Sequence, residues 1–412
     1  MNVSAMKNWE SVKLRYFLSL TKGSKPEEST STPNGNLPYL TMDYLRGREN
    51  LATQYPVSTD GLVLVRENDI LILWDGANAG EGVLSKEGYL SSTMAKIDYD
   101  RNRLDGDFLF YFLKCLEPAF KTFSSGTTIP HFDPSVLLDE VYNIPPLEEQ
   151  MVIVQALKNK VTTLNNAIGE YESLYEKVRQ FKTALLSEIV GKGVTRTEAL
   201  KYDNEGMNGE YPAHWVCAPL KYFLSENMSY GANESAESDN KAFPRYIRIT
   251  DITDDGNLRD ETFKSLSPEK AKDYMLSPGD ILFARSGATV GKAYLYRGGF
   301  DACYAGYLIR ARCGIKLLPE YLFLYTQTSM YEAWKNSVYI QATIPNIGAD
   351  KYSELRIIVP PIEEQKEIVI EATKKSEAIA KLQTELKSQI EDLYKYREAI
   401  ITEAVTGQID CR

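Results

Sequence analysis

Two six-residue stretches of this 412-residue chain decide its fold: Pro-Pro-Leu-Glu-Glu-Gln at residues 145–150 and Pro-Pro-Ile-Glu-Glu-Gln at residues 360–365. After each stretch, apolar residues recur every three or four positions. Proline suits the first turn of a helix and blocks helix before it, and paired glutamates favour the positive N-terminal end of the helix dipole. The sequence therefore predicts two long helices that begin at equivalent points of two related segments.

The apolar spacing in these helices averages about 3.5 residues, which is typical of a coiled-coil seam. Gly191 and Gly193 mark the predicted end of the first helix. The stripe includes Met151, Phe181 and Tyr396. A lone helix with such a stripe needs a partner, and the simplest one is the other helix of the chain. The seam residues are Leu157, Val161, Leu164, Ile168, Val178 and Leu185 in the first helix and Ile379, Leu386, Ile390, Leu393 and Ile400 in the second.

The rest of the chain is also duplicated, as a search for internal repeats shows. Three further pairs of stretches match in the same order: 9–19 with 215–225, 68–80 with 279–291, and 128–130 (Thr-Ile-Pro) with 343–345. The offset between copies grows from 206 to 215 residues, so the second copy has small insertions. Each copy is therefore one globular part followed by one helix.

The globular parts are predicted to be rich in short strands. The expected strands are residues 39–42, 69–73, 246–250 and 280–284. Aromatic-rich segments at 108–113 and 321–325 fit either a strand or a buried helix. Segments 21–36 and 226–241 have no periodicity and are expected to be surface loops, and 191–212 is expected to link the first helix to the second copy.

We therefore expect an α+β fold with two globular domains in tandem repeat, separated by two long helices that pack as an antiparallel coiled coil. The expected boundaries are 1–145 for the first globular domain, 146–205 for the first helix and linker, 206–360 for the second globular domain, and 361–412 for the second helix.

Composition excludes several classes of protein. With 43% hydrophobic and 11% aromatic residues the chain is ordinary globular protein rather than disordered. Five cysteines without a Cys-x-x-Cys pair argue against a disulfide framework or a structural zinc site. Because no apolar run approaches the ~18–20 residues of a membrane span and no signal peptide is recognisable, a cytoplasmic protein is expected.

Motifs for catalysis are not found. The only histidines, His131 and His214, are not accompanied by a nucleophile motif. The segment 287–292 has the wrong glycine spacing for a P-loop, and a turn that closes a strand is the better interpretation. Asp350 with Glu364-Gln365-Lys366 loosely resembles a metal-nuclease pattern, but the equivalent of that lysine in the first copy is Met151. No amino-methyltransferase tetrapeptide occurs, so we expect no catalytic residue and no metal site.

The duplicated Pro-Pro-(Leu/Ile)-Glu-Glu-Gln block resembles the specificity subunit of type I restriction–modification enzymes. The glycine turn at 279–292 and the terminal Ala-Val-Thr-Gly-Gln-Ile-Asp at 404–410 are similar to that family as well, and the likeness extends over essentially the whole chain. It implies that each globular domain is a target recognition domain that reads one half of a split, asymmetric site in double-stranded DNA. It also implies that the helices set the spacing. Two modification (methyltransferase) subunits would dock and bring S-adenosylmethionine, and restriction subunits could join; the chain itself would be no enzyme.

Elementary geometry agrees with this resemblance. Antiparallel helices turn a direct repeat into a pseudo-two-fold object, and the strands of DNA are also related by a two-fold axis. The charge, however, is a departure: the net charge is −10, and residues 1–145 carry 14 basic against 19 acidic residues. Because clustered basic groups normally dominate affinity for phosphates, we expect the isolated chain to bind DNA weakly.

Candidate DNA-binding residues are polar or basic side chains near the glycine turns and the Thr-Ile-Pro segments. They are Lys22, Lys25, Arg46, Arg48, Asn78, Ser125, Thr127 and Thr128 in the first copy and Arg248, Arg285, Ser286, Lys292, Gln341 and Thr343 in the second. Each could instead be a solvated or turn-stabilising residue. Two other hypotheses stay open: a coiled-coil adaptor whose duplicated domains bind proteins without DNA, and a module fused to an enzyme, against which the missing catalytic motifs argue.

Overall fold

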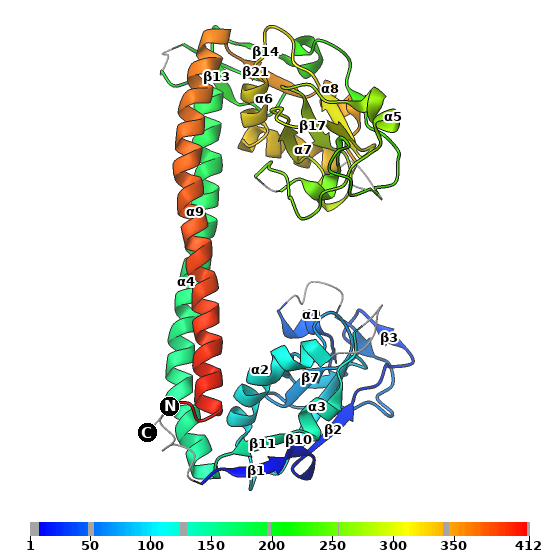
Figure 1. Cartoon of the computed structure of the whole chain (residues 1–412), viewed down its shortest axis with the longest axis vertical. Coiled ribbons are helices and arrows are strands. Elements are labelled where there is room, and N and C mark those ends of the chain that lie inside the picture. Colours follow the sequence, from blue (N-terminus) through cyan, green and yellow to red (C-terminus); the bar gives the residue numbers. More distant parts are fainter. Residues whose placement is uncertain are drawn as a thin grey trace. The chain divides into compact units, whose positions relative to one another are not determined.

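The computed structural model describes residues 8–47, 53–123, 130–195, 199–236, 238–253, 255–340 and 346–409. The chain divides into two compact units: residues 1–172 with 388–412 form the first, and residues 173–387 form the second. Each unit contains one globular α+β part and a portion of each of two long helices, α4 (Leu147–Lys192) and α9 (Ile362–Val405) (Figure 1).

The first unit is built on a four-stranded antiparallel sheet with strand order β2-β10-β7-β8. The central strand β7 (Ile70–Leu73) has four buried side chains, which alternate between the two faces of the sheet. Ile70 and Ile72 belong to the main core with helix α2 (Gly106–Phe123). Leu71 and Leu73 lie in a second apolar cluster on the other face.

The remaining elements of the first unit are short. The sheet is completed by β2 (Leu18–Lys22), β8 (Gly82–Leu84) and β10 (Met94–Tyr99). Smaller sheets pair β1 (Glu10–Lys13) with β11 (Val141–Ile144), β3 (Ser29–Thr30) with β5 (Tyr55–Pro56), and β9 (Gly88–Leu90) with both β4 (Tyr39–Leu40) and β6 (Leu64–Val65). Besides α2 and the portions of α4 and α9, the described helical segments of this unit are η1 (Leu14–Tyr16), α1 (Met42–Leu45) and α3 (Pro134–Leu138).

The second unit repeats the plan. Its four-stranded antiparallel sheet has the order β15-β20-β17-β18, with β15 (Ser229–Tyr230), β20 (Leu308–Ala311), β17 (Ile281–Ala284) and β18 (Ala293–Leu295). Further strands are β12 (Leu200–Tyr202) with β13 (Glu210–Pro212), β14 (Val216–Pro219) with β21 (Arg356–Val359), and the parallel pair β16 (Arg245–Ile247) and β19 (Ala302–Tyr304). The helical segments are η2 (Leu220–Phe223), η3 (Ile249–Asp251), α5 (Pro268–Ala271), η4 (Lys272–Tyr274), η5 (Gly287–Thr289), α6 (Pro319–Tyr325), α7 (Ser329–Ile340) and α8 (Ala349–Ser353).

Strand register makes the two units comparable residue by residue. In the first unit Ala95 lies between Lys22 and Ile72 on its two neighbouring strands. In the second unit Ile309 lies between Tyr230 and Phe283 in the same way. Lys22 of β2 is therefore the structural equivalent of Tyr230 of β15.

The glutamine of each repeated hexapeptide ties the start of its helix to the globular part. The Gln150 amide accepts a hydrogen bond from the Asp105 N–H at 2.8 Å and donates to the Arg103 and Pro145 carbonyls. Gln365 makes the same three bonds, to Leu318, Lys316 and Pro360. Both glutamines are fully buried, and leaving such groups unbonded is costly, so the repeated motif is a structural tie.

The two long helices run antiparallel within each unit. In the first unit the Tyr394 hydroxyl donates to Glu172 at 2.9 Å, and Arg397 donates to Asn165 at 2.7 Å. In the second unit Ile189 of α4 lies in one apolar core with Ile368 of α9. Residues with higher numbers on α4 therefore lie beside residues with lower numbers on α9, as antiparallel packing requires.

Several elements differ from the sequence expectation. The strands expected at 39–42 and 246–250 end at Leu40 and Ile247, because the next residues begin helical turns. Thr41 caps α1 by accepting from the Tyr44 N–H, and Asp251 accepts from the Arg248 N–H at 2.8 Å to cap η3.

The remaining differences concern segments that were ambiguous or expected to be irregular. The aromatic segments 108–113 and 321–325 are helical, within α2 and α6. The expected loops 21–36 and 226–241 contain β3 and β15, and the expected linker 191–212 contains β12 and β13. Helix α4 ends at Lys192, and the Gly193 N–H bonds back to the Ile189 carbonyl at a φ of +83° that favours glycine.

Candidate nucleic-acid interface

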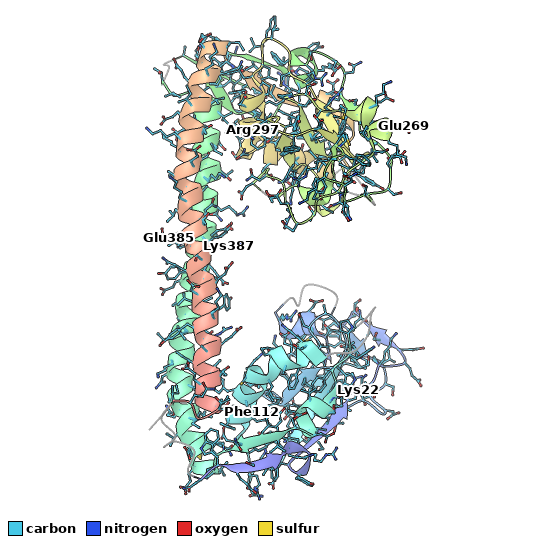
Figure 2. The ribbon with its side chains drawn as sticks, in the orientation of Figure 1. Lys22, Phe112, Glu269, Arg297, Glu385 and Lys387 are labelled. Atoms are coloured by element: carbon cyan, nitrogen blue, oxygen red, sulfur yellow. The ribbon has the colours of Figure 1, made fainter. Side chains whose placement is uncertain are left out.

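In the first unit, the chain that leaves β7 carries a small polar cluster. The Asp75 carboxylate accepts from His131 Nδ1 at 2.6 Å and from Lys22 Nζ at 3.3 Å. Lys22 also lies 5.1 Å from the centre of the Trp74 ring, and its side chain is 45% exposed (Figure 2). Lys22 is thus a surface cation whose charge a neighbouring carboxylate compensates.

In the second unit, the equivalent position after β17 carries Arg285. Its guanidinium centre lies 4.8 Å from the centre of the Tyr230 ring, and its Nε donates to the Asn346 side chain at 3.4 Å. The Arg285 N–H bonds to the Tyr307 carbonyl, and the Arg285 carbonyl accepts from the Ile347 N–H at 2.8 Å. Backbone and side chain are therefore both held in place.

A cation–aromatic pair occupies the same place in both units, but with the partners exchanged. In the first unit the cation Lys22 comes from the outer strand and the aromatic Trp74 follows the central strand. In the second unit the aromatic Tyr230 comes from the outer strand and the cation Arg285 follows the central strand. Such a pair is worth about 0.5–1 kcal/mol at an exposed site, so the exchange preserves local stability while changing which groups face solvent.

Two of the candidate DNA-binding arginines are already paired within the chain. Arg46 forms an ion pair with Glu81 at 2.6 Å. Arg248 bonds through Nε and Nη2 to the buried Asp251 carboxylate and to the Thr262 carbonyl, which assigns it to the turn rather than to a free surface.

The other described candidates differ in their exposure to solvent. Lys25 and Asn78 are exposed in the first unit, and Ser286 and Lys292 are half-buried in the second. Candidates outside the described residues are Arg48, Ser125, Thr127, Thr128, Gln341 and Thr343.

The eleven candidate seam residues are all buried or half-buried. In the first unit these are Leu157, Val161, Leu164, Ile168, Ile390, Leu393 and Ile400, and in the second Val178, Leu185, Ile379 and Leu386. Three other residues of the apolar stripe do not follow this pattern: Met151, Phe181 and Tyr396 are 58%, 60% and 57% exposed. The regular spacing therefore overestimates the buried stripe at these three positions.

Side-chain chemistry for catalysis is not evident in the described residues. Burial raises the pKa of Cys217 to about 11 and the pKa of Cys303 and Cys313 to about 12, so these thiols stay protonated at neutral pH. His214 pairs with Glu364 rather than with a nucleophile. Within the described part of the chain, no group of three or more His, Cys, Asp or Glu could hold a metal, and no helix is long and apolar enough to cross a membrane.

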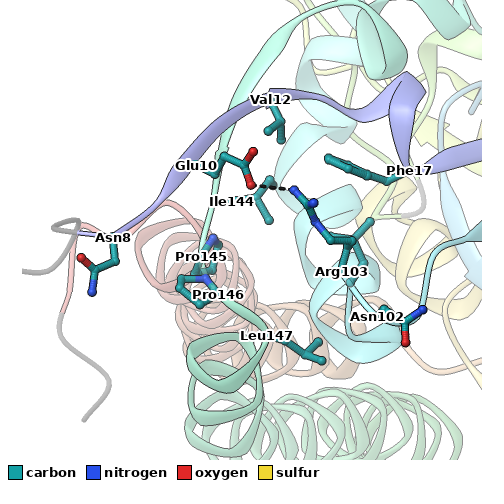
Figure 3. Close-up of a pocket in the computed structure, with 11 residues that line it drawn as sticks. Asn8, Glu10, Val12, Phe17, Asn102, Arg103, Ile144, Pro145, Pro146 and Leu147 are labelled. Carbon is teal, nitrogen blue, oxygen red and sulfur yellow. Dashed lines mark hydrogen bonds and ion pairs between the residues drawn. The ribbon is translucent and has the colours of Figure 1, made fainter.

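A cavity of about 280 Å³ lies in the first unit where α4 begins (Figure 3). Its walls include Arg103, which pairs with Glu10 at 2.6 Å and lies over the Phe17 ring, and the two prolines 145 and 146. Because its only arginine is already paired with a carboxylate, the cavity does not present a free cation to a phosphate.

The duplication has a direct counterpart among known proteins. The model of the family described as the type I restriction modification DNA specificity domain matches residues 6–171 and 228–392. These two copies span well over half of the chain, so the chain belongs to this family.

Two curated relatives match along nearly the whole chain. The type I restriction enzyme MjaVIII specificity subunit of Methanocaldococcus jannaschii is 28% identical, over 98% of this chain and 93% of the relative. The EcoBI specificity subunit of Escherichia coli is 20% identical, over 98% and 86%. A solved structure described in connection with complex assembly and conformational transition of the type I R-M system has the same fold, with a TM-score of 0.63, 16% identity and coverage of 98% and 99%.

Proposed function

We propose that this chain is the DNA sequence-specificity subunit of a type I restriction–modification complex, in which each globular domain reads one half of a split, asymmetric site. The observation that carries the proposal is the duplication itself: one framework occurs twice, with different side chains at the end of each sheet. Equal frameworks can address the two half-sites in equivalent ways, and unequal side chains can select different bases.

The target recognition domains in this proposal are residues 1–145 and 206–360, and residues 146–205 and 361–412 hold the helices that set the distance between half-sites. The burial of the candidate seam residues supports a coiled coil in which the helices act as a spacer.

Two modification subunits would dock on the chain and supply S-adenosylmethionine and the methylation chemistry, and restriction subunits could join them. The chain would then be a cytoplasmic subunit without catalysis of its own. Its charge supports this division of labour. Several basic residues are neutralised internally, and the net charge is −10, so the chain offers little phosphate-binding surface. Much of the affinity for DNA would come from the modification subunits.

The test is to co-express the chain with the modification subunit of the same genome in a host free of DNA methylation and to sequence the methylome. A split motif with methyladenine on both strands, absent without this chain, is expected. Exchange of residues 1–145 for another recognition domain should change one half of the motif only. Stable association with partner proteins without motif-specific methylation would instead favour the adaptor hypothesis.

A further inference from the structure

The side chain of Arg285 is oriented by the protein yet keeps its two terminal amino groups available. The guanidinium centre lies over the Tyr230 ring, and Nε donates a hydrogen bond to the Asn346 side chain. The Tyr230 hydroxyl accepts from the Ala349 N–H at 3.0 Å, so the supporting ring is itself held. Among the described residues, no carboxylate lies within ion-pair distance of Arg285, and no hydrogen bond engages Nη1 or Nη2.

This arrangement separates Arg285 from other arginines of the second unit. Arg248, Arg312 and Arg356 each form an ion pair with a buried aspartate, which compensates their charge within the protein. A guanidinium held over a ring, with two terminal amino groups that make no hydrogen bond within the described residues, matches the O6 and N7 acceptors on the major-groove edge of guanine. Because the ring contact and the Nε hydrogen bond already restrict the side chain, less rotamer entropy is lost when it binds.

The comparison between units favours a base over a phosphate as the ligand. DNA backbone geometry is the same in both half-sites, so a contact that only positions the backbone would be expected at equivalent places in both units. Here the place is equivalent but the chemistry is exchanged. In the first unit the cation is Lys22, which lies on the outer β-strand β2, and the Asp75 carboxylate compensates its charge. A contact that reads different bases in the two half-sites would show this difference.

We infer that Arg285 is a specificity-determining residue that reads a guanine in the half-site addressed by the second unit. The inference rests on the proposed function. It assigns Tyr230 and Asn346 as positioning residues that hold the guanidinium, and it assigns no equivalent guanine contact to Lys22.

The experiment uses the full chain, co-expressed with its modification subunit and followed by methylome sequencing. Residues 206–360 are first exchanged for another recognition domain. The half of the motif that changes is the half that the second unit addresses. That half is expected to contain an invariant guanine. Arg285→Gln should make this one position degenerate, with the preference for guanine reduced about 5- to 150-fold, as expected for loss of one bidentate contact.

The matched control is Arg297→Gln. Arg297 is another surface arginine of the second unit that lies over an aromatic ring, 5.6 Å from Phe323, but it faces the groove beside the long helices (Figure 2). Its replacement should leave the motif unchanged. Tyr230→Leu, which removes the ring beneath the guanidinium, should relax the same guanine position less than Arg285→Gln does, and Tyr230→Phe should relax it least. If Arg285→Gln does not fold, Arg285→Lys keeps the charge and the ring contact and should still lose the bidentate preference.

Two outcomes would overturn the inference alone: a second-unit half-site without an invariant guanine, or a variant that methylates the same motif at a lower overall level, which is the signature of a phosphate contact. A wild-type chain that directs no motif-specific methylation would overturn the proposed function and the inference together.

Discussion

The two units share their framework and differ in the groups that the framework presents. The ties of Gln150 and Gln365 are identical in donor, acceptor and burial, whereas Lys22–Trp74 and Tyr230–Arg285 exchange cation and ring. Buried polar ties tolerate little change because any unsatisfied group is costly, and a surface pair can be rearranged at almost no cost to stability. Duplication followed by divergence therefore leaves the interior equal and changes the surface.

The largest expected effect comes from a charge in the contact between the long helices. Leu386 is 4% exposed, and Leu164 is only half-buried. Leu386→Asp should lower the free energy of unfolding of the second unit by about 4 kcal/mol, because it removes a buried side chain and buries a charge. Leu164→Asp should cost the first unit about 2 kcal/mol on the same grounds. Chemical denaturation with hydrogen exchange resolved by unit measures both, and variants that remain as stable as the wild type and active would contradict the seam assignment.

The next effect tests whether the two glutamine ties are energetically equal. Gln365→Leu leaves one N–H and two carbonyls without partners, at an expected cost of about 3 kcal/mol to the second unit. Gln150→Leu should cost the first unit the same amount. The control is Gln155→Leu, at an exposed position of α4, which should change stability by less than about 0.5 kcal/mol. A large difference between the two ties would show that the framework has diverged in energy as well as in surface.

The equivalent tryptophans should respond differently to the same substitution. Trp215 Nε1 donates to Glu364 at 2.9 Å, whereas Trp9 Nε1 is buried without a partner among the described residues. Trp215 is 1% exposed and Trp9 is half-buried, so phenylalanine also removes more buried ring area at position 215 than at position 9. Trp215→Phe should therefore destabilise its unit by about 1 kcal/mol more than Trp9→Phe does. Equal losses in thermal denaturation would mean that the hydrogen bond contributes nothing net.

The smallest effect at neutral pH is the acid dependence that a buried aspartate of the second unit, Asp203, contributes. Burial would raise the pKa of Asp203, but hydrogen bonding to Asn208 and the charge of Arg356 outweigh it, so the pKa lies below its usual value. A lowered folded-state pKa means that this stabilisation is complete above the unfolded pKa of about 3.9 and is lost as pH falls through the folded pKa. In the strand pair of the first unit that corresponds to β14 and β21, the position of Arg356 is occupied by the exposed Val141, which has no charge to lower the pKa of a carboxylate.

Unit-resolved hydrogen exchange between pH 5 and pH 3 measures this difference. The wild-type second unit should lose protection in that window, and Asp203→Asn should reduce the pH dependence of the second unit without changing that of the first. The same acid response in Asp203→Asn as in the wild type would show that other carboxylates dominate.

Much of this architecture could be predicted from the sequence because it depends on local signals. The Pro-Pro-x-Glu-Glu-Gln blocks contain the start signals of both helices, and the strand residues 70–73 and 281–284 are continuous apolar runs before glycine turns. Local signals were weaker elsewhere. The segments 108–113 and 321–325 are apolar all round, so periodicity could not separate strand from buried helix. Two expected strands were cut short by side-chain caps at Thr41 and Asp251.

The amino-acid sequence by itself determined the duplication, the two long helices and the membership in a family of DNA specificity domains, since matching residues at regular offsets can be recognised without coordinates. Only the tertiary structure decided which side chains become neighbours. Lys22 and Trp74 are 52 residues apart and Tyr230 and Arg285 are 55 apart, and their pairing depends on the order of strands in each sheet. The physical reason is that strand pairing is non-local: register brings distant residues together, and no local pattern encodes which strand lies beside which.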